Sequence, residues 1–445
     1  MKTTYVTRTC RTEISRSNDQ YKELDRLCFL SKNLYNAALY IERQTYFNPD
    51  TKESIVNYTT LYNYMKDSNP DYLAMKKVHS KLAQNIVRHV ATTMYSFKKS
   101  LLDYEKNKNK YKGEPRLPGY KHKTAGRFLL SYNYQSLSIK DNKIRVKTDT
   151  GHLEFKIPRY LEGMVLPSNK ISLDSEDSTL ELKQLRIIPS SFHRYTIEIV
   201  YMKRITIPDI KSHDYPRVAS IDLGVNNLAT IVTNISKESP IIISGRYIKS
   251  YNKNFNKKLA DLKSKATIHN KLYTTNKIKN LYSSRDRYFN TNMHQLSSYI
   301  VNYLKAKQIS ILLIGYNKYW KNNSQLSNKV NQTFIQIPHR KLISLIQYKC
   351  YEVGISIYIL NESYTSGTSF LDNESPSQEN YNIKRRIHRG MFKTNTGLLI
   401  NSDVNASLQI MHKQYPKLKA SDIPGLSVFN PITIILPKVF QKSKV

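Results

Sequence analysis

The stretch RVASIDLGVNNLATIVTN, residues 217–234, decides how the second half of this chain folds. An apolar run around Ile221 ends at Asp222, and after a glycine-containing turn a second apolar run begins at Leu228. This pattern predicts a buried strand, a tight turn and a second strand. Asp is depleted from strands and costly to bury unpaired, so Asp222 must be solvated, capped or bound to a cation. Taken alone, the segment favours an ordinary turn aspartate.

The composition of the chain indicates a polyanionic partner. Its 445 residues include 70 Lys and Arg against 34 Asp and Glu, a formal net charge of +36. This length predicts two or three domains. Such a charge surplus is costly in self-repulsion unless a polyanion neutralises it, so nucleic acid is the expected partner. Abundant Lys, Asn, Ile and Tyr indicate an AT-rich genome, but that bias does not remove acidic residues.

The cysteines and the N-terminus exclude several classes of protein. Cys10, Cys28 and Cys350 form no C-x-x-C pair, which argues against a disulfide framework and against a structural zinc site. The first residues lack a continuous apolar segment, and no run approaches the length that spans a bilayer. We therefore expect a soluble, unsecreted protein without a membrane partner.

The first half of the chain is expected to combine strands with a helical insertion. Residues 1–12 alternate weakly and predict a strand, whereas apolar residues recur at helical spacing over 19–46 and 76–104. Short alternating runs over 127–202 predict a small antiparallel barrel or sandwich.

A basic loop follows the second helix. The segment KNKNKYKGEPRLPGYKHK, residues 106–123, interleaves many cations with Tyr111 and Tyr120. Such a charge run is either merely solvated or a surface for phosphates and bases, and both interpretations stay open.

The second half alternates strands with helices. Residues 203–217 hold two prolines and mark a domain boundary. The expected elements after the opening strands are a strand at 241–248, a long helical region at 249–307, a buried strand at 309–315, a helix at 338–353 and another buried strand at 355–362. Strands separated by helices predict a mixed or parallel sheet.

Two further carboxylates change the interpretation of Asp222. Glu362 ends the predicted strand at 355–362, and Asp403 lies where a helix begins, a place where Asp is commonly an N-cap. Ligands in open α/β sheets gather at the carboxyl ends of strands. Three carboxylates placed in this way on a basic protein are what a divalent-metal nuclease needs, because Mg²⁺ takes hard oxygen ligands.

RVASIDLGVNNLATIV resembles the first motif of the RuvC-like nuclease domain in TnpB proteins, the RNA-guided nucleases of insertion sequences, and in their eukaryotic and viral relatives, the Fanzor proteins. Further matches follow in the family's order over nearly the whole chain: SKNLYNAALY (31–40), PRLPGYKHK (115–123), QLRIIPSSFHRYTIEIVY (184–201), ESYTSGTSFLD (362–372), RRIHRG (385–390) and NSDVNASLQI (401–410).

The resemblance implies a multidomain α+β fold. Residues 1–205 would form a wedge-like β-barrel with a helical recognition insertion at about 19–110. Residues 206–412 would form an α/β RNase H-like, or RuvC-like, nuclease domain, and 413–445 a C-terminal tail.

The same resemblance implies an RNA-guided DNA endonuclease of a transposable element, with a guide RNA and target DNA as partners. Asp222, Glu362 and Asp403 would be the catalytic residues and would hold Mg²⁺, as two ions. The expected nucleic-acid contacts are Arg116, Tyr120, Lys121, Lys123, Arg385, Arg386 and Arg389. Two alternatives stay open: a guide-dependent DNA-binding repressor with a dead nuclease site, and a guide-independent, structure-selective nuclease.

Two departures from the family pattern matter. TnpB proteins usually carry their second catalytic Glu at the end of the strand that corresponds to 309–315, where this chain has Gly315. The chain resembles a subset in which this acid is relocated to the next strand, at Glu362. The usual zinc cysteines are also missing, since Ser369 and Asp372 stand at the first pair, so we expect no zinc in a degenerate hairpin at about 363–397.

Overall fold

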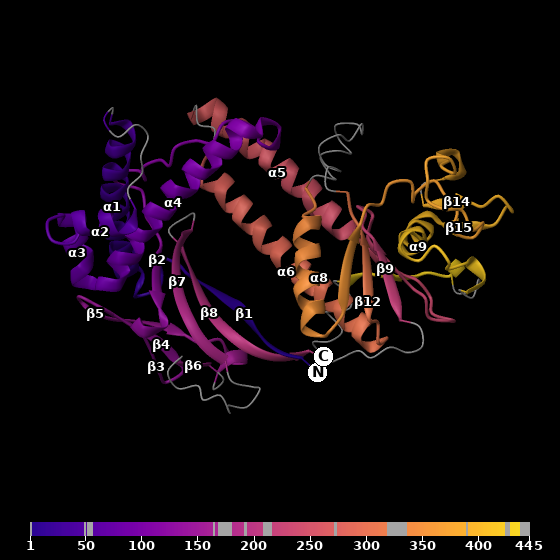
Figure 1. Cartoon of the computed structure of the whole chain (residues 1–445), viewed down its shortest axis with the longest axis horizontal. Helices are drawn as coiled ribbons and strands as arrows, with labels where there is room; N and C mark the ends of the chain where they lie inside the picture. Colours follow the sequence, from indigo (N-terminus) through magenta and orange to yellow (C-terminus); the bar gives the residue numbers. More distant parts are fainter. Residues whose placement is uncertain are drawn as a thin grey trace. The chain divides into compact units, whose positions relative to one another are not determined.

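The computed structural model describes residues 2–48, 50, 57–162, 165–167, 180–190, 194–207, 216–270, 274–317, 336–388, 390–422 and 428–436. Contacts between Cα atoms divide the chain into an N-terminal unit, Thr3–Ile205, and a C-terminal unit, Thr206–Val445 with Met1–Lys2. Both contain helices and sheets, which confirms the mixed α+β class (Figure 1). Nothing in the described part of the chain forms a helix long and apolar enough to cross a membrane.

The helices of the N-terminal unit form one cluster around a shared apolar core. They are α1 (Tyr21–Phe47), α2 (Tyr58–Met65), α3 (Pro70–Val78) and α4 (Ser80–Lys106). The predicted helix at 76–104 is thus divided between α3 and α4. The division lies at His79, whose extended backbone, with φ −167° and ψ 118°, interrupts the helical path.

The strands of the N-terminal unit form two sheets (Figure 1). The strands are β1 (Lys2–Ile14), β2 (Leu130–Asn133), β3 (Leu137–Lys140), β4 (Lys143–Thr148), β5 (Gly151–Lys156), β6 (Val165–Pro167), β7 (Leu180–Ser190) and β8 (Arg194–Ile207). One sheet has the order β1-β8-β7-β2 and the other β3-β4-β5. Their described pairs are mostly antiparallel, as expected, but β6 pairs with β7 in parallel.

A single mixed sheet organises the C-terminal unit, in the order β13-β12-β9-β10-β11-β16. Its strands are β9 (Val218–Asp222), β10 (Asn227–Thr233), β11 (Ile241–Ser244), β12 (Ile311–Gly315), β13 (Ser356–Leu360) and β16 (Ile432–Ile434). Strands β9, β12 and β13 are parallel, whereas β10 is antiparallel to both of its neighbours. This confirms the predicted mixed sheet. Strand β16 comes from the segment 413–445, which the sequence analysis treats only as a tail.

The other elements of the C-terminal unit are α5 (Arg246–Asn270), α6 (Asn276–Ala306), α8 (His339–Glu352), α9 (Ser402–Gln414), β14 (Met391–Lys393) and β15 (Leu399–Asn401). Two predictions are wrong in detail. The strand expected at 241–248 ends at Ser244, because the chain turns at Gly245 and enters α5. Strand β13 is not buried: it forms the sheet edge, and Tyr358 is 50% exposed.

The alternation of side chains along β9 assigns its two faces to different helices. Ala219 and Ile221 lie in the core shared with α6 and α8. Val218 and Ser220 face α9, through an apolar cluster and a hydrogen bond respectively. Since strand side chains alternate with a period of two, Asp222 belongs to the α9 face.

Candidate functional site

All three predicted acidic residues border one pocket of the C-terminal unit. The pocket has a volume of about 570 Å³, and Asp222, Glu362 and Asp403 line it together with Arg386 and Tyr381. The carboxylates come from segments of the chain 140 and 41 positions apart, so the tertiary structure alone brings them together.

A hydrogen-bonded contact between β9 and α9 sets the positions of Asp222 and Asp403. The hydroxyl of Ser220 donates to the carbonyl of Ser407 at 2.7 Å, inside the buried interface. Asp222 lies two residues further along the strand, about 7 Å. Asp403 lies four residues back along the helix, about 6 Å. Both residues line the same pocket.

The contacts of Asp403 show that it is not the N-cap of α9. The N-cap of α9 is Asn401, whose side-chain oxygen accepts from the backbone N–H groups of Asp403 and Val404. The carboxylate of Asp403 accepts a hydrogen bond of 2.7 Å from the amide of Asn227 and lies 3.5 Å from an Arg386 nitrogen. Asp403 thus presents its carboxylate to the pocket.

Glu362 lies two residues beyond the end of β13 and is held there by α9. The ammonium of Lys413 donates to the carbonyl groups of Asn361 at 2.9 Å and Ser363 at 2.7 Å, on both sides of Glu362. In the strand order β13-β12-β9, strand β12 lies between β13, which precedes Glu362, and β9, which ends at Asp222. A Cβ atom at Gly315, on the middle strand, would lie 3.3 Å from Cβ of Glu362.

The electrostatics of the pocket favour a cation. Burial raises the pKa of Asp222 well above its usual value, and repulsion from Asp403 and Glu362 raises it further. Burial also raises the pKa of Glu362 to about 7. One carboxylate oxygen of Glu362 is buried without a hydrogen-bond partner among the described residues. These hard oxygen donors fit Mg²⁺.

The three carboxylates do not form a compact metal cage. Over the described ranges, no group of three His, Cys, Asp or Glu side chains lies close enough together to hold an ion. An ion in the pocket would therefore require these side chains to turn toward it, or would take part of its coordination from water, as Mg²⁺ usually does.

The basic loop of the N-terminal unit presents its predicted contact residues to solvent. Arg116, Tyr120, Lys121 and Lys123 are all exposed. The guanidinium of Arg43 lies over the ring of Tyr120 at 4.9 Å, which fixes this aromatic side chain at the surface.

Side chains of α1 hold the backbone of this loop. Asn36 pairs with the peptide of Lys121 through two hydrogen bonds, of 2.8 and 2.9 Å. The buried ammonium of Lys32 donates to the carbonyl of Lys123 at 2.6 Å. The backbone of the loop is therefore preorganised, and the ammonium of Lys121 lies 5.2 Å from the ring centre of Tyr35.

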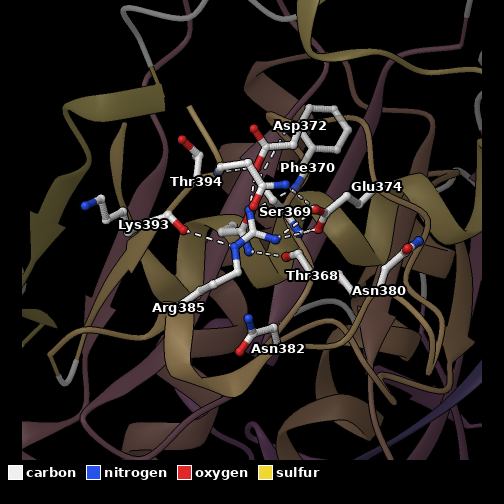
Figure 2. Close-up of polar contacts among 12 residues, drawn as sticks. Thr368, Ser369, Phe370, Asp372, Glu374, Asn380, Asn382, Arg385, Lys393 and Thr394 are labelled. Carbon is white, nitrogen blue, oxygen red and sulfur yellow. Dashed lines mark hydrogen bonds and ion pairs between the residues drawn. The ribbon is translucent and has the colours of Figure 1, made fainter. Parts of the chain in front are cut away.

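Arg385, a predicted nucleic-acid contact, directs its guanidinium to carboxylates of the protein itself. Its side chain is only 10% exposed and donates to both carboxylate oxygens of Glu374, at 2.7 and 2.8 Å, and to Asp372 (Figure 2). Its Nε donates to the carbonyl of Lys393. Arg386 borders the acidic pocket instead, and Arg389 lies outside the described residues.

This ion-pair cluster occupies the place where the family resemblance puts zinc. Asp372 accepts from the backbone N–H of Asn395, and Glu374 accepts from the backbone N–H of Ser369, each within 2.8 Å. Charged side chains thus join the loop 368–374 to the β14–β15 hairpin (Figure 2).

We predict that folding of this region does not need zinc, because carboxylates and a guanidinium stand where a tetrahedral site would need thiolates. Chelator treatment should leave the melting temperature of the purified protein unchanged, and elemental analysis should find zinc well below one atom per chain. Stoichiometric zinc together with unfolding by chelator would contradict this prediction.

Several residues that shape the pocket were not among the predicted site residues. Asn227 contacts Asp403, and Lys413 holds the segment of Glu362. Asn227 lies within the opening LGVNN turn and could have been found by its position after Asp222. Lys413 had no local signal, since its partners are backbone carbonyls about 50 positions away.

Two segments of the chain match known protein families. Residues 204–321 match the OrfB_IS605 family, described as probable transposase, and residues 339–410 match the Cas12f1-like TNB domain. No curated protein matches the chain.

Several solved structures are similar over most of the chain. A Cas12f1–sgRNA–target DNA complex is 14% identical, with a TM-score of 0.35, and the match covers 93% of this chain and 100% of that one. The mini-RNA-guided endonuclease CRISPR-Cas_phi3 is 11% identical, with a TM-score of 0.43 and coverage of 93% and 92%. C2c1 of Alicyclobacillus acidoterrestris with single-guide RNA is 9% identical, with a TM-score of 0.39 and coverage of 91% and 68%.

The two family matches lie one after the other on the unit that carries the acidic pocket. Both matches confirm the resemblance to the TnpB family that was found in the sequence.

Proposed function

We propose that this chain is an RNA-guided DNA endonuclease of a transposable element, which cuts its target by Mg²⁺-dependent hydrolysis. The observation that carries the proposal is the pocket that Asp222, Glu362 and Asp403 line together. The matches to the OrfB_IS605 family and to the Cas12f1-like TNB domain support it, since the resemblance to TnpB proteins implies this activity. The strand order β13-β12-β9-β10-β11, with β10 antiparallel, supports an RNase H-like, RuvC-like nuclease domain.

In this proposal the three carboxylates hold the metal at the edge of the sheet. Bound Mg²⁺ would supply positive charge to stabilise the attacking and leaving oxygens of the phosphodiester. Asn227 and Lys413 keep the carboxylates in place by the hydrogen bonds described above. Arg386 holds positive charge beside Asp403, where a phosphate group of the substrate would arrive.

The surroundings of the pocket support a polynucleotide substrate. A larger pocket of about 1320 Å³ shares Arg386 and Asp403 with the acidic pocket, and Arg246 and His388 also line it. Such a polar, partly cationic cavity suits a nucleic-acid strand better than a small apolar ligand.

The N-terminal unit is proposed as the wedge-like barrel and helical insertion that hold the guide RNA. Its exposed basic loop, already shaped by α1, supports this role, because a preorganised surface loses less entropy on binding.

The test is to purify the protein with its bound RNA, sequence that RNA, and measure cutting of a matched DNA target. Cutting is expected with RNA and Mg²⁺ and is expected to stop on chelation or RNA removal. Guide-dependent binding without cutting would favour the repressor. Equal cutting without RNA would favour a guide-independent nuclease.

Neutralising the basic loop should weaken RNA retention. In the triple variant Arg116→Gln, Lys121→Gln and Lys123→Gln, the affinity for RNA should fall and its salt dependence should flatten, because each lost phosphate contact removes counterion release. The measurement is RNA binding across a salt series.

A matched triple variant separates a local effect from the loss of charge. Lys76→Gln, Lys140→Gln and Lys147→Gln remove the same charge from exposed positions of the same unit. If both triple variants lose RNA equally, or if the loop variant retains RNA at every salt concentration, the loop is not the RNA contact.

A further inference from the structure

The cluster around Arg385 joins three segments that are separate in sequence. Arg385 belongs to the turn Ile383–Arg385, its carboxylate partners lie in the loop 368–374, and its carbonyl partner, Lys393, ends β14. The guanidinium also lies 4.9 Å from the ring centre of the buried Phe392. Arg385 is thus held from several sides, and Figure 2 shows its partners converging on the guanidinium.

The loop 368–374 is fixed in turn to α9, the helix of Asp403. The side chain of Asn405 accepts from the N–H of Phe370 and donates to the carbonyl of Thr368, at 3.1 and 2.7 Å. Gln409, one helical turn further, donates to the carbonyl of Glu374 at 3.0 Å. Residues four apart lie on one helix face, so a single face of α9 holds the loop.

Arg386, the residue that follows Arg385, also contacts α9, on the side that borders the acidic pocket. Arg386 donates to the hydroxyl of Ser402 at 3.0 Å and lies 3.5 Å from the carboxylate of Asp403. Contacts therefore run in a closed path from Asp403 along α9 to the loop, through the carboxylates to Arg385, and back through Arg386.

We propose that Arg385 is a positioning residue, whose ion pairs with Asp372 and Glu374 hold Arg386 against Asp403. The proposal rests on the proposed metal-dependent function only where it treats the acidic pocket as a metal site. The contacts between Arg385, Arg386 and α9 do not require a bound ion. The planar guanidinium of Arg385 binds two carboxylates in one fixed orientation. These ion pairs fix the backbone at Arg385, and therefore also the position of the adjacent residue, Arg386.

The decisive variant is Arg385→Lys, which keeps the charge but cannot form the paired contacts of a guanidinium. The first measurement is backbone hydrogen exchange of the full-length protein without added metal. Exchange at 383–388 should become at least tenfold faster, with strands β9 and β12 unchanged. The control is Lys384→Met, an exposed neighbour, which should leave exchange unchanged.

The second measurement is Mn²⁺ binding, followed by the spectroscopic signal of the free ion. Arg386→Met should tighten binding about two- to fivefold, because removing one partner of a partly exposed ion pair frees Asp403 for the cation. Arg385→Lys should also tighten it, and the double variant should bind no more tightly than Arg386→Met alone. If Arg385 only stabilised the fold, Arg385→Lys would weaken Mn²⁺ binding, and the effects of the two substitutions on the binding free energy would be additive.

Each outcome decides the proposal. Unchanged exchange at 383–388 in folded Arg385→Lys would overturn it, as would additive Mn²⁺ effects. If that variant does not fold, Glu374→Gln replaces it in both measurements with the same expectations. Absence of Mn²⁺ binding in the wild-type protein would instead overturn the proposed metal site, while hydrogen exchange would still decide the role of Arg385.

Discussion

Replacing Asp222 with Asn, or Glu362 with Gln, is expected to slow Mg²⁺-dependent DNA cleavage by roughly a thousandfold or more. Both substitutions keep the size of the side chain and remove its charge. Metal binding at this pocket depends on that charge, because hard cations need anionic oxygen ligands. Guide-directed DNA binding should stay at the wild-type level, since the basic loop that is proposed to hold RNA belongs to the other unit.

The control for charge removal is Glu379→Gln. Glu379 is exposed, lies in sequence between the loop 368–374 and Arg385, and does not line the pocket, so its substitution removes one negative charge without removing a pocket carboxylate. This variant should cut like the wild type. Cleavage and DNA binding are measured on the same preparations, each loaded with the same guide RNA.

Glu362 is the sharper of the two tests. If Glu362→Gln cuts at the wild-type rate while Asp222→Asn does not, Glu362 is only a buried neighbour of the metal site. If the wild-type protein never cuts despite bound guide and a matched target, the repressor takes the place of the nuclease.

Placing an acid at Gly315, where most TnpB proteins carry one, is expected to destabilise the C-terminal unit and not to restore activity. A Cβ atom at this position would lie 2.4 Å from Cδ1 and 3.1 Å from Cγ1 of Ile410, a fully buried residue of α9. Overpacking of this kind costs about 1–3 kcal/mol. The double variant Gly315→Glu with Glu362→Gln should therefore stay inactive and melt at a lower temperature.

The clash itself can be tested with smaller changes. Gly315→Ala should lower the free energy of unfolding by about 1–3 kcal/mol, whereas Gly113→Ala, where a Cβ meets no atom within 4 Å, should not. Ile410→Val removes the Cδ1 atom, so its combination with Gly315→Ala should be less destabilising than the sum of the two. Additive losses in chemical denaturation would show that the Ile410 side chain is not the obstacle.

Much of the C-terminal unit could be predicted from the sequence. The strand–turn–strand around Asp222, the strand at Gly315 and the helix before β13 follow from apolar runs with clear ends. These features depend on residues close together in sequence, whose periodicity a single chain displays. The order of the three parallel strands is not contained in these local patterns, because β9 and β12 are separated in sequence by two other strands and two helices.

The tertiary structure alone decided how individual side chains are used. Arg385 and Arg386 are adjacent and chemically identical, yet one is buried between Asp372 and Glu374 and the other borders the acidic pocket. Charge and motif indicated nucleic acid for both. The difference arises from partners that the fold supplies from other segments.

The same reason explains the exposed strand β13 and the added strand β16. The apolar run at 355–360 predicts a strand, but whether a strand is central or at the edge depends on how many neighbours it receives. Residues 432–434 become a strand by pairing with β11, almost 200 positions earlier. The sequence alone determined which segments could be strands and which carboxylates could hold a metal. Contacts between distant segments decided which strands are buried and which charges meet, because burial and ion pairing depend on partners that local sequence does not contain.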